Sequence, residues 1–436
     1  MKKVIFLAGS SMVIIALMAG FACAQTASAT KEPIKIGYIS NIRQPYGKSG
    51  TVAIQIAVDE INNGGGISGR PVKLIIEDNK GEVPMTAAAY KKLVLTDGCL
   101  LVFTEGSTHT LAGQEIGLSM FKEYPHIQIG VWTASDDPSQ RVLKDYNKYK
   151  FYFRCHASNA TITPIYDNAY FSIFKSAGVK KIALVVEELD YTLAVRKGDP
   201  KTGMLSGEER CKKAGFDVVY NAVFGATEKM FLPMLEMIAS SGAQAVYMTA
   251  AYSDLVTLAK QWAVSSAKGI TIVNNGGPAN LGKAFWDMTE GAALGWVAPL
   301  IHVPNLNITE KTRPFMQKME AKGAAGYENA YNSYDLPFHL KNAIAKAGTS
   351  TDANAIIKAF EQVETIGTMG TLKFDSKSHD RYYPLENNGY PYYTYWFAQY
   401  QNNCDIVVLS PSQVAEKTNP GKKFVPAGEL RAKDKR

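Results

Sequence analysis

The sequence predicts an α/β protein made of two domains, each built on a doubly wound parallel sheet. Short apolar, β-prone runs alternate with segments whose apolar residues recur at helical spacing, which is typical of parallel sheets covered by helices. The runs are too numerous for one sheet, and 436 residues are enough for two or three domains. No Pro/Gly/Ser-rich linker divides the chain, so we expect it to cross between the two domains several times.

Each predicted strand is a short run of apolar, β-prone residues, as expected of a strand buried on both faces. In chain order these runs are residues 34–40, 71–78, 99–103, 127–132, 181–186, 216–224, 243–250 and 270–275. From about Gly370 the pattern of residue types changes, and Tyr and Trp alternate with other residues in the segment 390–401. This alternation predicts antiparallel strands or a hairpin that completes the fold, with the aromatic rings packed on a sheet.

Helices are predicted between most of the strands. In residues 51–62 the apolar side chains fit helical spacing better than alternation, and the Asn- and Gly-rich segment 62–66 ends the helix. Residues 85–98 predict a second helix that ends at Gly98, and residues 111–121 predict a third. Strand, helix and strand therefore follow one another in the rhythm of βαβ units.

The N-terminus has the pattern of a secretory signal peptide. Lys2 and Lys3 precede an apolar run over residues 4–24, which small residues suited to cleavage follow. We expect a signal peptide of residues 1–24, with cleavage possible as late as residue 29, and a periplasmic mature protein. The alternatives are a membrane anchor and a lipoprotein attached through Cys23.

Composition and charge describe an ordinary soluble protein after cleavage. The chain is 46% hydrophobic and 20% charged, and the formal net charge of +7 includes Lys2 and Lys3. The basic residues are scattered except in residues 421–436, which we interpret as a solvated tail rather than a nucleic-acid site. Four cysteines follow the predicted cleavage site, without metal or redox spacing: Cys99, Cys155, Cys211 and Cys404. Disulfides and buried free thiols are both possible for them.

Two glycine-rich segments and the histidines give no cofactor or metal site. Residues 45–50 contain Gly-Lys-Ser, but a phosphate loop needs a glycine at the position of Ile42. The segment 64–69 follows a helix and precedes a strand, which is the reverse of a dinucleotide-binding turn. The six histidines show no paired spacing, so we expect neither a metal nor a cofactor.

The segment 103–110, FTEGSTHT, combines Glu105, Ser107 and His109 and raises the possibility of a hydrolase. No Gly-x-Ser-x-Gly elbow surrounds Ser107, so we expect no catalytic residue there. The segment follows a predicted parallel strand and leads into a helix, where free N–H groups and hydroxyls suit an anion. The next strand ends similarly, with Thr133 and Ser135. The two loops together predict a carboxylate-binding site.

These loops, together with the passage 59–78, resemble the branched-chain amino-acid-type periplasmic solute-binding proteins of ABC transporters. The matching features are Glu60-Ile61-Asn62, Gly65-Gly66-Ile67, Gly69 and Asp78. The resemblance extends from about Ile34 to Asp380 and implies the type I periplasmic binding fold. It implies an N-terminal lobe of residues 33–154 and 300–367, a C-terminal lobe of residues 155–299 and 368–410, three hinge crossings, and a C-terminal tail of residues 411–436.

The resemblance also implies a ligand site between the lobes. The matched positions are Tyr46, Ser107, Thr133, Ser135, Tyr191, Tyr252 and Asn275. Asn275 stands where amino-acid binders place an acidic residue for the ammonium, and a neutral amide cannot neutralise that charge. This departure favours a carboxylate without an α-amino group, aromatic or aliphatic, or a small amide. Arg43 and His156 lie near matched positions and could add positive charge.

The predicted function is capture of a small-molecule solute for an ABC importer, with permease and ATPase subunits as partners. We expect a monomer that binds no nucleic acid. Two alternatives remain, a binding protein that docks on a membrane receptor as a sensor and a secreted hydrolase that uses Ser107 and His109.

Overall fold

Two separate sheets contain most of the strands of the computed structural model, which describes residues 1, 32–300, 303, 306, 308–384, 391–393 and 395–434. The predicted signal peptide lies, apart from Met1, outside the described residues. The first sheet has the order β2-β1-β3-β4-β5 and is parallel throughout. Its strands are β1 (Ile34–Ser40), β2 (Val72–Asp78), β3 (Leu101–Glu105), β4 (Ile127–Trp132) and β5 (Tyr152–Arg154).

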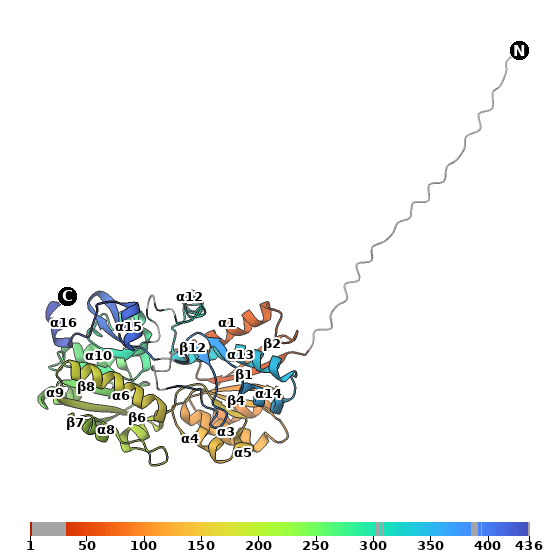
Figure 1. The fold of residues 1–436 in the computed structure, drawn as a ribbon, viewed down its shortest axis with the longest axis horizontal. Coiled ribbons are helices and arrows are strands. Elements are labelled where there is room, and N and C mark those ends of the chain that lie inside the picture. Colours follow the sequence, from red (N-terminus) through yellow and green to blue (C-terminus); the bar gives the residue numbers. More distant parts are fainter. Residues whose placement is uncertain are drawn as a thin grey trace. The chain divides into compact units, whose positions relative to one another are not determined.

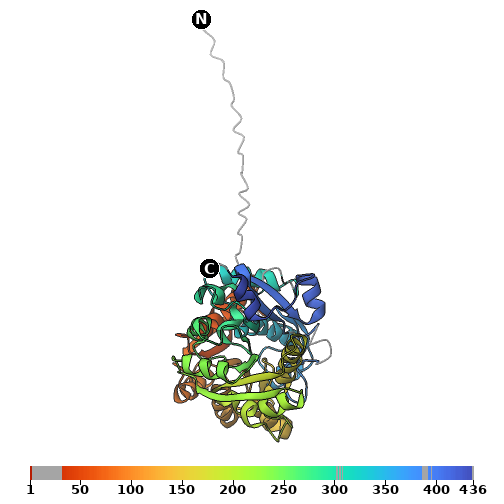
Figure 2. The same cartoon turned by 90° about the vertical axis from the view of Figure 1, so that its left-hand side faces the viewer.

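The second sheet has the order β14-β13-β10-β9-β8-β6-β7. Its strands are β6 (Lys181–Glu188), β7 (Asp217–Gly225), β8 (Ala245–Thr249), β9 (Thr271–Asn274), β10 (Val297–Pro299), β13 (Phe397–Gln401) and β14 (Asp405–Ser410). The strands from β6 to β10 are parallel, whereas β13 and β14 are antiparallel additions at one edge. Figure 2 shows the long strands β6 and β7 side by side. The predicted α/β class with two doubly wound lobes is confirmed.

The helices connect successive strands and pack on both sheets (Figure 1). Those before β6 are α1 (Pro45–Asn63), α2 (Val83–Lys91) with the π-helical turn η1 (Lys92–Thr96), α3 (Ser107–Met120), α4 (Asp137–Lys144), α5 (Tyr146–Tyr149) and α6 (Asn159–Ser176). Between β6 and β10 lie η2 (Asp190–Thr192), α7 (Leu193–Lys197), α8 (Gly207–Lys213), α9 (Leu232–Ser240), α10 (Leu255–Val264), η3 (Gly277–Leu281) and α11 (Lys283–Met288). After β10 follow α12 (Thr312–Ala321), α13 (Glu328–Ala347), α14 (Ala353–Phe360), η5 (Asn402–Cys404), α15 (Ser412–Thr418) and α16 (Ala427–Lys433).

Local sequence signals explain where several of these helices begin. Ser158, Ser206 and Asp254 accept hydrogen bonds from the backbone N–H groups three residues later, which caps α6, α8 and α10. The first helix starts earlier than we predicted, because Pro45 occupies its first turn, where a missing N–H costs nothing. The Gly-Lys-Ser segment is therefore part of α1 and not a loop.

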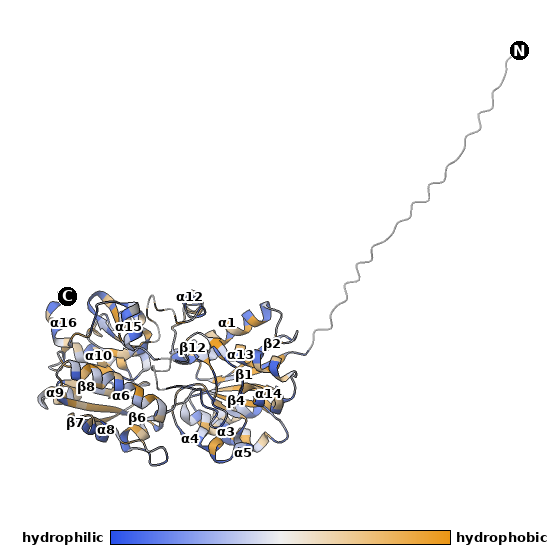
Figure 3. Ribbon diagram, in the orientation of Figure 1, coloured by the Kyte–Doolittle hydropathy of each residue, from blue (hydrophilic) through white to orange (hydrophobic). Residues whose placement is uncertain are grey.

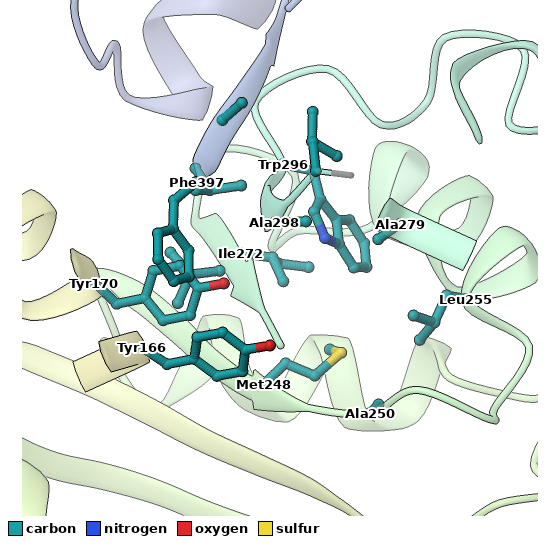
Figure 4. Close-up of a cluster of buried hydrophobic side chains, with 14 of the residues drawn as sticks. Tyr166, Tyr170, Met248, Ala250, Leu255, Ile272, Ala279, Trp296, Ala298 and Phe397 are labelled. Carbon is teal, nitrogen blue, oxygen red and sulfur yellow. The ribbon is translucent and has the colours of Figure 1, made fainter. Parts of the chain in front are cut away.

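The core divides between the two sheets, and the hydropathy colouring of Figure 3 concentrates the hydrophobic colour on the strands. In the core of the second sheet, called the second core below, the rings of Tyr166 and Tyr170 contact Phe397 of β13 edge-on. Their centroids lie 5.3 and 5.1 Å from that of Phe397 (Figure 4). The aromatic segment before residue 401 thus packs on the sheet, and β13 forms an antiparallel pair with β14 as expected.

The structure places two segments differently from our expectations. We assigned residues 368–410 to the second lobe, yet Leu372 and Phe374 lie in the core of the first sheet, where Phe374 contacts Phe153 and Phe360. The hairpin of β11 (Thr365–Gly367) and β12 (Gly370–Leu372) carries them there from the end of α14.

The segment 421–436 is not a solvated tail in its described part. Ala427 and Leu430 of α16 are buried in the second core, and the Arg431 guanidinium lies 4.2 Å from the ring centroid of Trp262. Two apolar residues at helical spacing are enough to fix a short helix on a sheet, even within a basic run. The long side chain of Arg431 then covers apolar surface with its stem.

The four cysteines within the described residues are free, and Cys99, Cys155 and Cys211 are buried. Burial raises the pKa of the Cys155 and Cys211 thiols to about 12, so both remain protonated at neutral pH. Among the described residues, no helix combines the length and the apolar character needed to span a membrane.

A buried carboxyl group anchors the β11–β12 hairpin and makes stability depend on pH. Asp335 of α13 accepts hydrogen bonds from the Thr368 N–H at 2.8 and 2.9 Å and from its hydroxyl at 3.0 Å. Burial raises the pKa of Asp335 to about 6, although Arg381 and Thr368 act against the increase. A carboxyl group whose pKa is raised by folding stabilises the protein at low pH, and this contribution is lost as the pH rises through about 6.

We therefore expect Asp335→Asn to remove one component of the pH profile. Relative to the variant, the wild type should lose about 3 kcal/mol of unfolding free energy between about pH 4 and about pH 7.5. Urea titrations of both proteins at the two pH values measure this difference, with the exposed Asp59→Asn as the control. An identical pH dependence in wild type and Asp335→Asn would contradict the assignment.

Candidate functional site

A cavity of about 680 Å³ lies where the carboxyl ends of the two sheets face each other. From the first sheet it is lined by residues at or after the ends of β1, β2, β3 and β4, and from the second by residues at or after the ends of β6, β7, β8 and β9. The carboxyl edge is where open α/β sheets bind their ligands, because the loops and helix N-termini there are free of sheet pairing. The volume is within the range of small-molecule sites.

The first-sheet side of the cavity contains the N-terminus of α3. Gly106, Ser107, Thr108 and His109 line the cavity, and the N-cap residue, Gly106, has no side chain with which to cap the helix. Gly106 has a φ of 81°, a left-handed conformation that an L-residue adopts only with strain, and this turn brings the first N–H groups of α3 to the cavity. Free N–H groups at the positive end of a helix attract an anion.

Ser107 is held in place by the neighbouring loop. Its Oγ accepts a hydrogen bond from the Ser135 N–H at 3.1 Å, which leaves the hydroxyl hydrogen free to be donated to a ligand. Ser107 and His109 do not form a nucleophile–base pair, because the His109 Nδ1 instead pairs with the Thr86 hydroxyl at 2.9 Å. The geometry therefore gives no support to a serine hydrolase.

Two of the predicted site residues do not line the cavity. The Thr133 hydroxyl is fully buried and pairs with the Thr110 hydroxyl at 2.7 Å. Ser135 supports the site through its backbone, because its N–H holds Ser107 and its carbonyl accepts a hydrogen bond from Arg154. The residues on either side of Thr133, Trp132 and Ala134, line the cavity instead, because side chains alternate along this extended segment.

Aromatic rings from both sheets meet beside the cavity. The ring of Tyr252, which follows β8, lies 6.0 Å from Tyr46 of α1 and 5.2 Å from Trp132 of β4. The ring of Tyr191 of η2 lies 5.7 Å from that of Tyr252. All four side chains line the cavity, and sequence reasoning missed Trp132. Its position as the last residue of a predicted strand was the available signal.

A single carboxylate positions Tyr191 and Tyr252. Glu187 of β6 is fully buried and accepts hydrogen bonds from the backbone N–H groups of Ala251, Tyr252 and Ser253, at 2.7 to 3.2 Å. The Ser253 hydroxyl donates to it at 2.5 Å, and the Tyr191 hydroxyl donates to it as well. The backbone N–H groups of the loop after β8 thus bind the Glu187 side chain and are not free to bind a ligand.

Asn275 lines the cavity and also fixes the chain beside it. Its Oδ1 accepts a hydrogen bond from the Ala250 N–H at 2.8 Å, so this oxygen is already engaged at the end of β8. Arg43, by contrast, lies outside the cavity and pairs with Asp78 at 3.2 Å with most of its side chain exposed.

Several charged side chains line the cavity. Burial raises the pKa of Glu105, although the hydroxyls of Tyr38 and Ser40 and the Asn329 amide donate to it. On the second-sheet side, Arg196 of α7 pairs with the exposed Glu188 at 3.3 Å, and the buried Nε of Arg196 has no partner among the described residues.

Glu328 at the start of α13 also lines the cavity, 3.3 Å from the Nε2 of His156. Burial alone would raise the pKa of Glu328, but His156 and the hydroxyls of Tyr393 and Tyr395 outweigh it and hold the pKa below its usual range. His156 is thus the one of the two possible extra cations that reaches the cavity. Within the described part of the chain, no group of three or more His, Cys, Asp or Glu side chains could hold a metal ion.

The family model described as "Periplasmic binding protein" matches residues 33–402, which is most of the chain. The chain belongs to this family. The resemblance inferred from the segment 59–78 and the strand-end loops is therefore confirmed, and the family consists of solute-binding proteins. Membership implies an extracytoplasmic location.

Curated relatives are named as Leu/Ile/Val-binding proteins or their homologs. A 106-residue segment is 32% identical to "Leu/Ile/Val-binding protein homolog 4" of Brucella abortus, but it spans 22% of this chain and 25% of that protein. Over 370 residues, the chain is 23% identical to "Leu/Ile/Val-binding protein homolog 3" of Brucella melitensis, which covers 84% of this chain and 92% of that one.

Solved structures share the fold. A putative branched-chain amino acid ABC transporter protein from Silicibacter pomeroyi superposes with a TM-score of 0.71 at 19% identity, covering 91% of this chain and all of that one. An isoleucine complex from Streptococcus pneumoniae has a TM-score of 0.67 at 19% identity, with 87% of this chain and 100% of that one covered. A benzoate complex from R. palustris has a TM-score of 0.66 at 16% identity, with 86% and 95% covered.

Proposed function

We propose that this chain is the extracytoplasmic solute-binding component of an ABC importer, and that it captures a small carboxylate-bearing solute between its two lobes. The observation that carries this proposal is the uncapped N-terminus of α3, with Ser107 beside it, at a cavity that both sheets line. The solute carboxylate would accept hydrogen bonds from the first N–H groups of α3 and from the Ser107 hydroxyl.

The opposite lobe would complete the site. Tyr191 and Tyr252 would cover the apolar part of the solute, and Arg196 would supply positive charge from the second sheet. The Thr108 hydroxyl donates to Asp190 of η2 at 2.8 Å, and Lys201 pairs with Asp137 at 2.9 Å. These contacts join the two lobes and would stabilise the closed form around its solute.

The isoleucine and benzoate complexes among the structural neighbours support the carboxylate, which both of those ligands carry. Amino acids, aromatic and aliphatic acids and their amides are the candidates. We infer that the protein acts as a monomer and delivers its solute to permease and ATPase subunits, without turnover of the solute. A panel of these compounds in a thermal-shift screen, followed by calorimetry, identifies the solute class, because a ligand that binds the folded state raises the melting temperature.

Ser107→Ala is expected to weaken binding of the best carboxylate about tenfold to a hundredfold, because one hydrogen bond to a charged group is lost. Isothermal titration calorimetry measures the change. Ser119→Ala is the control, since Ser119 lies exposed on the same helix. Unchanged affinity in Ser107→Ala would count against this position of the carboxylate.

A further inference from the structure

Asn280 is a buried amide whose oxygen is unused. It belongs to η3, which follows β9, and it lines the cavity although only 6% of the residue is exposed. Its Oδ1 is buried and has no hydrogen-bond partner among the described residues. Buried polar atoms in folded proteins are nearly always paired, so an unpaired acceptor at a ligand cavity calls for a donor from the ligand.

The backbone around Asn280 is held tightly in place. Gly277 has a φ of 68°, and a Cβ there would lie 2.4 Å from the Ala251 carbonyl oxygen, so the loop after β9 is pressed onto the loop after β8. The Asn274 side chain donates to the Ala250 carbonyl at 2.9 Å and accepts from the Gly276 N–H at 2.8 Å. These contacts fix the backbone of the loop that leads into η3, which carries Asn280.

Asn280 lies close to the loop that carries Tyr252. A Cβ on Gly276 would be 3.6 Å from the Asn280 Nδ2 and 3.7 Å from the Ala251 Cβ, so the Gly276 backbone separates the two side chains by little more than one atom layer. The unpaired amide therefore lies on the second-sheet side of the cavity, whereas the N-terminus of α3 lies on the first-sheet side.

We propose that Asn280 determines specificity by accepting a hydrogen bond from an N–H or O–H group at the end of the solute remote from its carboxylate. This inference rests on the proposed function. It implies that a carboxylic acid with an amide, amine or hydroxyl at that end binds better than one with a branched aliphatic end. A purely aliphatic group would bury the Asn280 oxygen without a partner, and sites built to hydrogen-bond a ligand group reject analogues that lack it.

Calorimetry with matched pairs of compounds tests the proposal on the full mature protein. The pairs are asparagine and leucine, succinamate and isocaproate, and para-hydroxybenzoate and para-toluate. Within each pair the shapes are similar and only one member has a donor. We expect the wild type to bind the donor-bearing member at least about tenfold more tightly in the pair that fits the cavity. Equal or tighter binding of the apolar member in every pair would overturn the proposal.

Two variants assign the preference to Asn280. Asn280→Leu keeps the shape but removes the acceptor, so the preference should disappear, whereas Asn280→Asp keeps an acceptor and should retain it. Circular dichroism and the melting temperature establish that each variant is folded. If Asn280→Leu does not fold, loss of the preference in Asn280→Asp still counts against the proposal, and its retention supports it.

The outcomes also separate this inference from the proposed function. If carboxylates bind, and bind less tightly to Ser107→Ala, while Asn280→Leu keeps the wild-type preference, the inference fails and the proposed function stands. If no carboxylate of the panel binds the wild type, the proposed function fails, and the inference fails with it.

Discussion

Replacing Glu187 with Gln is expected to lower the unfolding free energy by about 3–5 kcal/mol and to abolish solute binding. Glu187 is fully buried and accepts five donors, three of them backbone N–H groups of the loop after β8. A glutamine side chain would turn its own NH₂ group toward these donors, so at least one N–H would be left buried without an acceptor. Tyr191 and Tyr252 would then lose their common anchor.

Chemical denaturation measures the loss of stability, and calorimetry with the best ligand measures the loss of binding. Glu188→Gln is the stability control, since Glu188 is the next residue along the strand and its side chain is 65% exposed. We expect less than about 1 kcal/mol from this control. A Glu187→Gln protein as stable as the wild type would show that the carboxylate is not needed to hold the loop.

Replacing Arg154 with Met should cost about 3 kcal/mol of unfolding free energy, since removing one partner of a buried ion pair leaves the other uncompensated. Arg154 is 1% exposed and donates from Nε and Nη2 to the two carboxylate oxygens of Asp380, both at 2.7 Å. Its Nη1 donates to the Ser135 carbonyl, in the loop that holds Ser107. The variant should therefore weaken solute binding as well.

Arg43→Met is the matched control, because Arg43 also pairs with an aspartate but is 68% exposed. An exposed ion pair contributes at most about 1 kcal/mol, so the control should remain close to the wild type. Equal destabilisation by the two substitutions would contradict the role assigned to burial. A destabilised Arg154→Met protein with wild-type affinity would instead uncouple Arg154 from the solute site.

The secondary structure and the edge of the sheet that carries the site could be predicted from the sequence. Continuous apolar runs such as residues 34–40 and 181–186 report burial on both faces, and burial of this kind fixes parallel strands. A strand followed by a polar loop and a helix places its side chains at the carboxyl edge. Ser107 was found in this way, since the argument needs no contact that is distant in the sequence.

The sequence did not predict which side chains would be used within the fold. Thr133 follows the end of a strand as Ser107 does, yet its hydroxyl forms a hydrogen bond with the Thr110 hydroxyl. The basic segment 421–436 was expected to be solvated. Ala427 instead packs on the second sheet, and its N–H donates a hydrogen bond to the Thr271 hydroxyl at 3.0 Å. Partners such as these cannot be derived from local spacing, since they depend on how distant elements pack.

The sequence by itself determined the two-lobed α/β architecture, the family and the edge of the sheets that lines the cavity, because hydrophobic periodicity and strand-end loops are local properties. The tertiary structure alone decided which polar groups form hydrogen bonds within the protein and which remain available to a ligand. Glu187 and Asn275 accept hydrogen bonds from backbone N–H groups around residue 250, whereas the amide oxygen of Asn280 has no partner among the residues that the structure describes. The physical reason is that each polar group can form only a few hydrogen bonds. The packing of distant segments determines which groups are its partners.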